Sequence, residues 1–298
     1  MQRVKVLPEL VTRKKNTHKG NYGRVLILAG SPGMTGAAYL CSKAALRSGS
    51  GIVTLGIPES LNPVMETKLT CVMTYPLPET GEHTLAYKGR EKILELCERN
   101  DIIAIGPGLS QQPETKKLVI WLVKTIDRTI VIDADGLNAL EGNLNMLYKI
   151  KKNAVLTPHP GEMSRLINLG SAKDVQKDRL EIATQFIQSM HKRLGNEKCI
   201  VLVLKGNKTI VADYGRVYVN NTGNPGMATA GAGDVLTGII ASLIGQGLSE
   251  FDASQLGAYI HGLAGDMASK KKGEDSMIAS DILDFLPDAF MRYKKEKK

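Results

Sequence analysis

The chain has 298 residues, 43% of them hydrophobic, which is enough to bury the core of one large α/β domain or two small ones. Its net charge of +9 comes from local groups of lysine and arginine before residue 20, at 270–272 and at 294–298, and only 5% of the residues are aromatic. Terminal lysine runs are usually solvated, and single-stranded nucleic acids bind to aromatic platforms. We therefore expect a solvated basic C-terminal tail and no nucleic-acid partner.

The cysteines lie far apart and form no Cys-x-x-Cys pair: Cys41, Cys71, Cys97 and Cys199. The five histidines form no group with acidic residues at ligand spacing. Both observations argue against a disulfide scaffold and against a metal site built from protein side chains. The N-terminus has no continuous apolar region for export, and apolar runs such as 118–123 are too short to span a bilayer. We expect a cytoplasmic protein without membrane contact.

Short β-branched runs alternate with helical patterns almost from end to end. Their continuous apolar character indicates strands that are covered on both faces, as in a parallel sheet. We predict strands at 24–29, 52–56, 102–105, 129–133, 154–157 and 199–204. Helical patterns fall at 36–48, 88–99, 114–124, 160–169, 178–194, 235–246, 253–269 and 280–286. Further strands at 210–212 and 216–219 flank Asp213-Tyr214-Gly215, which predicts a hairpin and an antiparallel edge.

This order of elements predicts one doubly wound α/β domain over residues 1–298, with a mostly parallel sheet and helices on both faces. Such sheets bind ligands beyond the carboxyl ends of their strands. Clusters of small and polar residues follow five of the predicted strands, at 29–33, 106–108, 133–136, 157–162 and 205–208. With a sixth cluster at 231–234, they are expected to outline one long cleft.

The sixth cluster, Gly231-Ala232-Gly233-Asp234, directly precedes an apolar helix pattern. Residues without bulky side chains let main-chain N–H groups approach a ligand, and a helix start adds partial positive charge. Gly231, Ala232 and Gly233 therefore predict an anion hole for phosphate. A carboxylate repels phosphate, so Asp234 is suited to take a proton from a group that attacks phosphorus. Taken alone, the pattern fits an Asp N-cap after a glycine-rich turn equally well.

A competing nucleotide-binding pattern is Gly30-x-x-Gly33-x-x-Gly36, followed by Tyr39-x-x-x-Lys43. It resembles the cofactor turn and the catalytic pair of short-chain dehydrogenases. A tyrosine and a lysine inside the first helix cannot also lie beside a nicotinamide across the sheet. We interpret Tyr39 and Lys43 as ordinary contacts on one helix face.

Several other residues have both a ligand-binding and a structural interpretation. His159, held between two prolines, can bind a ligand or be satisfied by loop backbone. Lys205 can meet phosphate as a point charge or lie in a solvated turn. Asp133 and Asp135 can hold Mg²⁺ through water beside phosphates, but capping of the following helix is our preferred interpretation. Gly238 is expected to allow close packing of its helix on the sheet.

Gly-Ala-Gly-Asp before a helix resembles the ribokinase superfamily. More specifically, the chain resembles the bacterial ADP-dependent NAD(P)H-hydrate dehydratases in six ordered motifs, and the similarity spans about residues 17–288. The motifs are Lys-Gly-Asn-Tyr-Gly at 19–23, Ala-Ile-Gly-Pro-Gly-Leu at 104–109, Val-Ile-Asp-Ala-Asp-Gly at 131–136, Leu-Thr-Pro-His-Pro-Gly-Glu at 156–162, Val-Leu-Lys-Gly at 203–206 and Gly-Asn-x-Gly-Met-Ala at 223–228. Many members have Gly-Gly-Ser/Thr-Gly-Asp or Gly-Gly-Met-Gly-Asp where this chain has Ala-Gly-Ala-Gly-Asp, a change that keeps the main-chain donors.

The resemblance implies repair of a damaged cofactor. A hydroxyl at C6 of the reduced nicotinamide is phosphorylated at the expense of ADP, or of ATP, with Mg²⁺, and loss of phosphate regenerates NADH or NADPH. It implies that Asp234 is the catalytic residue. The hydrated dinucleotide would contact Ala37, Ala38, Gly106, Gly108, His159 and Asp234, and the adenine nucleotide would contact Lys205, Gly206, Asn207, Lys208, Thr209 and Gly233.

The resemblance also implies a homotetramer. The epimerase domain that is fused upstream in many relatives has no counterpart in this sequence, so we expect a separate NAD(P)H-hydrate epimerase as a functional partner. Two alternatives are a vitamin or sugar kinase of the same superfamily and a non-catalytic nucleotide-binding module.

Overall fold

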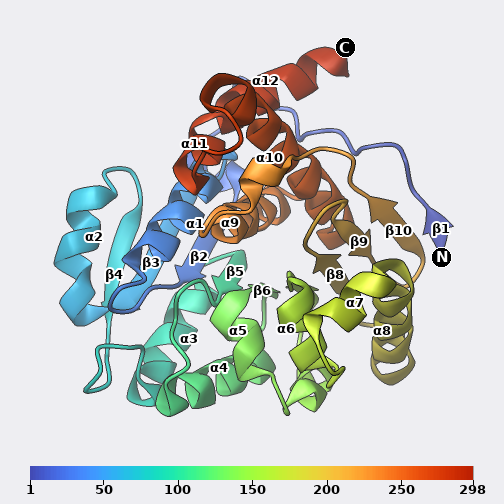
Figure 1. Cartoon of the computed structure of the whole chain (residues 1–298). Helices are drawn as coiled ribbons and strands as arrows, with labels where there is room; N and C mark the ends of the chain where they lie inside the picture. The colour runs from blue at the N-terminus through green and yellow to red at the C-terminus, as the bar shows by residue number, and fades with distance from the viewer. Residues whose placement is uncertain (298) are drawn as a thin grey trace.

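A mixed sheet of ten strands forms the centre of the computed structural model, which describes residues 1–297 (Figure 1). The strands lie in the order β1-β10-β9-β8-β7-β6-β5-β2-β3-β4. From β8 across to β4 all neighbours are parallel, whereas β9 runs antiparallel to both β8 and β10. The strand bounds are Gln2–Arg3 (β1), Arg24–Leu28 (β2), Ile52–Pro58 (β3), Met73–Leu77 (β4), Ile102–Ile105 (β5), Thr129–Ile132 (β6), Ala154–Leu156 (β7), Ile200–Leu204 (β8), Ile210–Ala212 (β9) and Arg216–Val219 (β10).

Helices cover both faces of this sheet, which confirms the predicted doubly wound α/β architecture. One face packs against α1 (Thr35–Arg47), α2 (Asn62–Lys68), α9 (Ala232–Gly245) and α10 (Glu250–Lys272), with α11 (Ala279–Asp284) and α12 (Leu286–Glu296) outside them. The other face packs against α3 (Arg90–Glu98), α4 (Pro113–Thr125), α5 (Ala134–Ala139), α6 (Pro160–Leu166), α7 (Ala172–Lys177) and α8 (Arg179–Leu194). Short 3₁₀ helices lie at Lys19–Tyr22, Glu59–Leu61, Tyr87–Gly89, Leu144–Lys149 and Pro225–Met227. Within residues 1–297 no helix has both the length and the apolar character needed to cross a membrane.

The predicted strands and helices are all present with small shifts at their ends, and the β9–β10 hairpin is antiparallel as expected. Two groups of elements were not predicted from the sequence: the outermost strands β1 and β4, and the short helices α2, α5 and α7. β1 has only two residues, and β4 contains Pro76, which occurs at sheet edges because it cannot donate a hydrogen bond. These elements are too short for a clear hydrophobic period.

The expected solvent exposure of the C-terminal lysines is confirmed at Lys294, Lys295 and Lys297. Residues 286–296, however, form helix α12 and not an extended tail. Leu286, Ala289 and Tyr293 are buried on one face of this helix, and the Tyr293 hydroxyl donates to the Pro8 carbonyl at 2.5 Å. Lys294 and Lys295 lie in its last turn, where cations interact favourably with the helix dipole. The lysine run therefore belongs to an amphipathic helix that packs back on the N-terminal segment.

Strand order places the topological switch point of the sheet between β2 and β5. From β2 the chain winds outward through β3 to β4, and it then returns to β5 and winds the other way through β6 and β7 to β8. The loops that leave neighbouring strands at such a point diverge to opposite faces and open a crevice beyond the carboxyl ends. The loops after β2 and β5, at residues 29–34 and 106–112, therefore border the expected ligand cleft.

Gly238 allows α9 to approach α1, whereas the sequence analysis expected it to pack on the sheet. A Cβ atom at this position would overlap the carbonyl oxygen of Cys41 and lie 2.9 Å from the Ala44 Cβ. The close contact at Gly238 is part of an extensive packing of α1 against α9. This packing positions the first turn of α9 relative to α1, which follows the loop after β2.

We predict that Gly238→Ala lowers the free energy of unfolding by about 1–3 kcal/mol, because overlap with main chain outweighs the roughly 1 kcal/mol that alanine gains over glycine in a helix. Chemical denaturation measures the change. Gly81→Ala is the control, because a Cβ there meets nothing within 4 Å. Equal stability of the two variants would contradict the close contact.

Candidate active site

The anion-hole residues form the first turn of α9. The N-cap is Gly231 in the left-handed conformation (φ 92°), no side chain caps this helix, and Asp234 lies within its first turn. The capping interpretation of Asp234 is therefore wrong. Within residues 1–297 the N–H groups of Gly233 and Asp234 donate no hydrogen bond, whereas Ala232 N donates weakly to the Thr229 carbonyl at 3.4 Å. Free main-chain donors at a helix N-terminus can bind an anion.

Two carboxylates hold Lys205 beside the first turn of α9. Its Nζ donates to Asp133 Oδ1 at 2.7 Å and lies 3.7 Å from Glu162 Oε2. Burial alone would lower the pKa of Lys205, but the neighbouring Asp133 and Glu162 carboxylates raise it above its usual value. A Cβ added at Gly233 would lie 3.1 Å from Lys205 Nζ. The lysine is therefore charged and lies against the anion-hole backbone, so the solvated-turn interpretation is wrong.

Asp133 serves this lysine and does not cap α5. It occupies the N-cap position without a side-chain capping bond, and its Oδ2 accepts from the Thr237 hydroxyl at 2.7 Å. Asp135 accepts from Ser110 N at 2.9 Å and from Asn138 Nδ2 at 3.1 Å. Our capping interpretation is therefore wrong for both residues: Asp133 ties β6 to β8 and α9, and Asp135 ties the β5 loop to α5.

Asp234 is half-buried near these charges. Burial and the Asp133 carboxylate raise its pKa to about 7, although Lys205 opposes the shift. The Cβ position of Gly231 is 3.9 Å from Asp234 Oδ2, so the carboxylate folds back toward the start of its own helix. A carboxylate with a pKa near neutrality can both accept and release a proton at physiological pH.

His159 caps α6 with its ring. Its Nδ1 accepts from the main-chain N–H groups of Gly161 and Glu162 at 3.0 and 3.3 Å. Burial, Lys205 and Arg165 lower its pKa, so the ring is neutral at pH 7 and carries its proton on Nε2. Nε2 lies 3.4 Å from Glu162 Oε1, and the side chain remains half exposed. The histidine is thus satisfied by loop backbone on one side, while its Nε2–H remains directed at Glu162.

The glycine loops at the switch point contact each other directly. Ser31 Oγ donates to the Gly108 carbonyl at 2.8 Å, and Gly30 N donates to the Pro107 carbonyl at 2.9 Å. A Cβ at Gly108 would come within 3.1 Å of the Ala37 Cβ, and Gly106 packs on the Asp133 carbonyl. The structure therefore brings Ala37, Gly106 and Gly108 together near Asp133. Ala38 is fully buried beneath Gly30, so its expected contact with a substrate is wrong for its side chain.

The rest of the predicted nucleotide-binding turn lies outside this group. Asn207 and Lys208 are exposed, and Thr209 Oγ1 donates to the Gly206 carbonyl at 3.1 Å. Arg179 fixes the turn, because its guanidinium donates to the carbonyls of Leu204 and Lys205 at 2.7 and 3.0 Å and also to that of Asn207. No hydrogen bond or ion pair joins Asn207, Lys208 or Thr209 to Asp234 within the described residues.

Sequence reasoning missed Glu162, Thr237 and Arg179 as contributors to the site. Glu162 belongs to the Thr-Pro-His-Pro-Gly-Glu motif at 157–162. A glutamate at the third position of a helix is typical of a capping box, so the sequence could have predicted its bond to the His159 main chain. Burial raises the pKa of Glu162, against the effect of Lys205. Thr237 and Arg179 lie inside helices that show only ordinary periodicity, so no local pattern distinguishes them.

The side chains present fit a magnesium ion that arrives with nucleotide phosphates. Within residues 1–297 no group of three metal-ligating side chains is gathered. Asp133 and Glu162 are hard oxygen donors near the anion hole, but both already contact Lys205. Mg²⁺ commonly takes one or two carboxylates and completes its shell with water and phosphate oxygens. These two carboxylates would hold it in that way.

Comparisons with known proteins agree with this geometry. The family model described as NAD(P)H-hydrate dehydratase matches residues 25–288. The bifunctional NAD(P)H-hydrate repair enzyme Nnr of Moorella thermoacetica is 47% identical over 289 residues, which cover 97% of this chain and 53% of that protein. The chain thus spans about half the length of the curated relatives it matches.

Solved structures are similar to this chain over nearly its whole length. The ADP/ATP-dependent NAD(P)H-hydrate dehydratase from Bacillus subtilis, co-crystallized with ATP/Mg²⁺, is 31% identical with a TM-score of 0.81 over 95% of this chain and 94% of that one. A ribokinase-like superfamily protein from Enterococcus faecalis is 24% identical with a TM-score of 0.77 over 95% of this chain and 92% of that one. The second likeness supports the ribokinase-like fold.

We predict that Asp234→Asn gains stability relative to the wild type as pH rises. The folded-state pKa of Asp234 is raised to about 7, so the folded protein holds this proton more tightly than the unfolded chain and loses that advantage between about pH 4 and pH 7. The difference in melting temperature, variant minus wild type, should therefore be more positive at pH ~8 than at pH ~5, by a few degrees. A difference that does not change with pH would contradict the assigned environment.

We predict that Lys205→Met lowers the free energy of unfolding by about 3 kcal/mol at neutral pH, because it leaves the buried Asp133 carboxylate without its cation. The double variant Lys205→Met/Asp133→Asn should recover at least half of this loss. Lys177→Met is the matched control, since Lys177 Nζ also lies 2.7 Å from a carboxylate, that of Asp174, but in an exposed pair. Denaturant titration of the four proteins measures the effect, and an equal loss in Lys177→Met would refute it.

Proposed function

The chain belongs to the NAD(P)H-hydrate dehydratase family, and we propose that it removes water from the S epimer of hydrated NADH or NADPH at the expense of ADP, or of ATP in its place, with release of AMP and phosphate when ADP is used. The observation that carries this proposal is Asp234, a carboxylate with a pKa of about 7, in the first turn of α9 beside free main-chain N–H groups. This arrangement suits transfer of a phosphoryl group to an alcohol.

The proposed reaction begins when Asp234 accepts the proton of the C6 hydroxyl. The hydroxyl oxygen forms a bond to the terminal phosphorus of ADP as the bond from that phosphorus to the bridging oxygen breaks, and AMP leaves with that electron pair. The C6–O bond then breaks and inorganic phosphate departs with its electrons. Loss of a proton from the adjacent ring carbon restores the C5–C6 double bond, so hydrated dinucleotide and ADP are converted to NAD(P)H, AMP and phosphate.

The remaining residues bind and orient the reactants. The N–H groups of Gly233 and Asp234 would hold the transferred phosphoryl group, and the Lys205 ammonium lies beside the same backbone to offset its charge. Mg²⁺, held by the nucleotide phosphates with Asp133 and Glu162, would neutralise further negative charge. Ala37, Gly106, Gly108 and His159 would line the dinucleotide end of the proposed cleft, with Ala38 buried beneath them. Lys205–Thr209 would line the adenine-nucleotide end, with Ala232 completing the anion-hole turn.

The partners and setting of the reaction are also part of the proposal. The curated relatives are described as bifunctional repair enzymes of about twice this length, which supports coupling to an epimerase that supplies the S epimer. The co-crystal of the Bacillus subtilis protein with ATP/Mg²⁺ supports nucleotide and magnesium use. A cytoplasmic homotetramer is proposed from the family resemblance, and sedimentation equilibrium tests its oligomeric state.

We predict that Asp234→Asn lowers kcat by about 10²–10⁴ and leaves the affinity for ADP within a few-fold, because only the proton acceptor is lost. In the wild type kcat/KM should rise with pH and level off above about pH 7, as the Asp234 carboxyl loses its proton. Hydrated NADH or NADPH, Mg²⁺ and ADP or ATP are the reactants. Recovery of reduced-nicotinamide absorbance and release of phosphate are followed together.

The controls separate the alternatives. A vitamin or sugar kinase would phosphorylate a stable alcohol and leave the absorbance unchanged, and a non-catalytic nucleotide-binding protein would release no phosphate. Asp174→Asn should keep wild-type turnover, because Asp174 is a partly exposed residue of α7 whose ion-pair partner is Lys177. Near-normal turnover in Asp234→Asn would refute the role given to this carboxylate.

A further inference from the structure

The loop from β10 to α9, residues 220–230, contains the Gly-Asn-x-Gly-Met-Ala motif at 223–228, to which the proposed function assigns no role. This loop leads directly into Gly231, the N-cap of the anion-hole turn. Apart from the short 3₁₀ helix Pro225–Met227 it has no regular structure. Contacts with neighbouring elements must therefore fix its position.

Helix α10 binds the start of this loop through its own carbonyl oxygens. Asn220 Nδ2 donates to the Ala258 carbonyl at 3.1 Å, and Thr222 Oγ1 donates to the Tyr259 carbonyl at 2.9 Å. The approach is close because Gly262 has no side chain, and a Cβ there would overlap Thr222. The loop therefore lies directly on α10.

Asp266 of α10 fixes the middle of the loop through an ordered series of hydrogen bonds. Its Oδ2 accepts from Gly223 N, and its Oδ1 accepts from Asn224 Nδ2, both at 3.0 Å. Asn224 Oδ1 in turn accepts from Gly226 N at 3.0 Å. The series requires two acceptors at position 266, and one donor and one acceptor at position 224. An aspartate and an asparagine meet this requirement.

The segment that Asp266 holds supports the anion hole by two routes. Along the chain, only residues 228–230 separate it from Gly231. In space, it packs against the start of α11: an added Cβ at Gly226 would lie 2.6 Å from Met277 Sδ, and one at Gly231 would lie 3.1 Å from the Ala279 Cβ. Since no side chain caps α9, the first turn of this helix depends on such contacts for its position.

We propose that Asp266 and Asn224 are positioning residues for phosphoryl transfer, which hold the main-chain donors of Gly233 and Asp234 in place through the loop between β10 and α9. The inference rests on the proposed function, because those donors are the groups that would bind the transferred phosphoryl. Neither side chain needs to touch a reactant. Since misplacement by about 1 Å can cost about a hundredfold in rate, a pair that is remote from the chemistry can control turnover.

An exchange of the two side chains provides the test. Asn224→Asp places a carboxylate oxygen against Asp266 Oδ1, and Asp266→Asn sets an amide N–H against another donor, so each single variant breaks one hydrogen bond of the series. In the double variant Asn224→Asp/Asp266→Asn, the new amide at 266 accepts from Gly223 N and donates to the new carboxylate at 224. That carboxylate still accepts from Gly226 N, so the whole series is restored.

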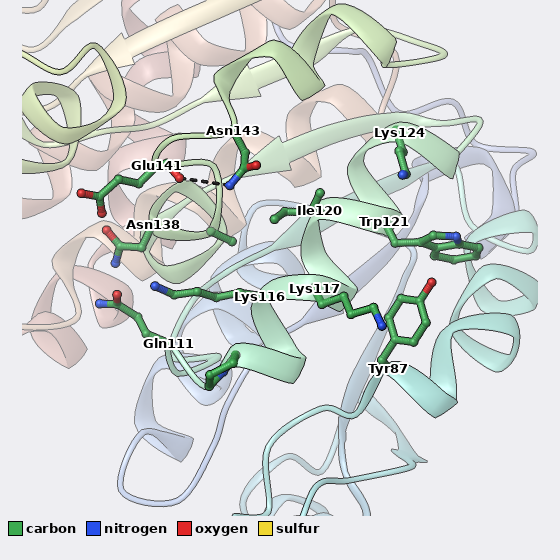
Figure 2. A pocket seen from close by; sticks show the side chains of 12 residues that line it. Tyr87, Gln111, Lys116, Lys117, Ile120, Trp121, Lys124, Asn138, Glu141 and Asn143 are labelled. Atoms are coloured by element: carbon green, nitrogen blue, oxygen red, sulfur yellow. Dashed lines mark hydrogen bonds between the residues drawn. The ribbon is translucent and has the colours of Figure 1, made fainter.

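We expect each single variant to lower kcat about tenfold or more at saturating hydrated NADPH and ADP, and the double variant to return to within about threefold of the wild type. Asn143→Asp is the matched control. Its Nδ2 also donates a hydrogen bond, to the Glu141 carbonyl at 3.2 Å, but on the surface beside α4 (Figure 2). This variant should keep the wild-type kcat.

Melting temperatures separate positioning from stability, and all rates are measured well below them. Single variants that melt earlier but keep kcat within about threefold of the wild type would mark a contact for stability alone, which overturns the inference. A double variant that is no faster than the single variants also overturns it.

A binding measurement separates this inference from the proposed function. If the wild type binds ADP with Mg²⁺ but does not dehydrate hydrated NADPH, the proposed function fails, and ADP affinity from isothermal titration calorimetry becomes the readout. A loss of affinity of about tenfold in both single variants, regained in the double variant, would still support the pair as positioning residues. Equal ADP affinity in all four proteins would overturn it.

Discussion

The site depends on one buried ammonium group. Lys205 joins the ends of three strands, because Asp133 follows β6, Glu162 follows β7 and Lys205 itself follows β8. A charge taken out of water must be paired, so the fold that buries Lys205 must also deliver both carboxylates to it. The Thr237 hydroxyl extends the same network to α9, and thus fixes the anion-hole turn relative to the sheet. Stability and the proposed phosphate binding therefore rely on the same contacts.

The network has an electrostatic consequence for Asp234. Asp133 is the neighbouring charge that raises the pKa of Asp234 most, Glu162 raises it further, and Lys205 opposes both. Burial and these carboxylates make a proton on Asp234 favourable near neutral pH, while the free N–H groups of α9 still attract phosphate. When phosphate arrives, a magnesium ion between the carboxylates and the phosphate would reduce the repulsion. The proposed proton acceptor and the proposed anion-binding N–H groups thus lie within the same helical turn.

Close backbone contacts determine where a substrate can enter. The loops at the switch point pack glycine against alanine and against main-chain carbonyls, as at Gly108 beside Ala37 and at Gly106 on Asp133. Such contacts leave few side chains to recognise a ligand at this end of the cleft. Recognition by charged and aromatic groups must then come from neighbouring elements of the fold. The switch-point loops therefore provide close backbone packing, and the residues that would recognise a ligand lie elsewhere.

The sequence by itself determined the class of fold, the order of the main elements and the glycine-rich clusters after the strands, because periodicity and small-residue turns act over a few neighbouring residues. It also singled out Asp234, as an acidic residue at the start of an apolar helix. Only the tertiary structure decided that Asp133 pairs with Lys205 across 72 residues, that Gly238 packs on a helix, and that the C-terminal lysines belong to α12. Ion-pair partners and helix contacts depend on which strands become neighbours in the sheet, and strand order is a property of the whole chain that no local pattern contains.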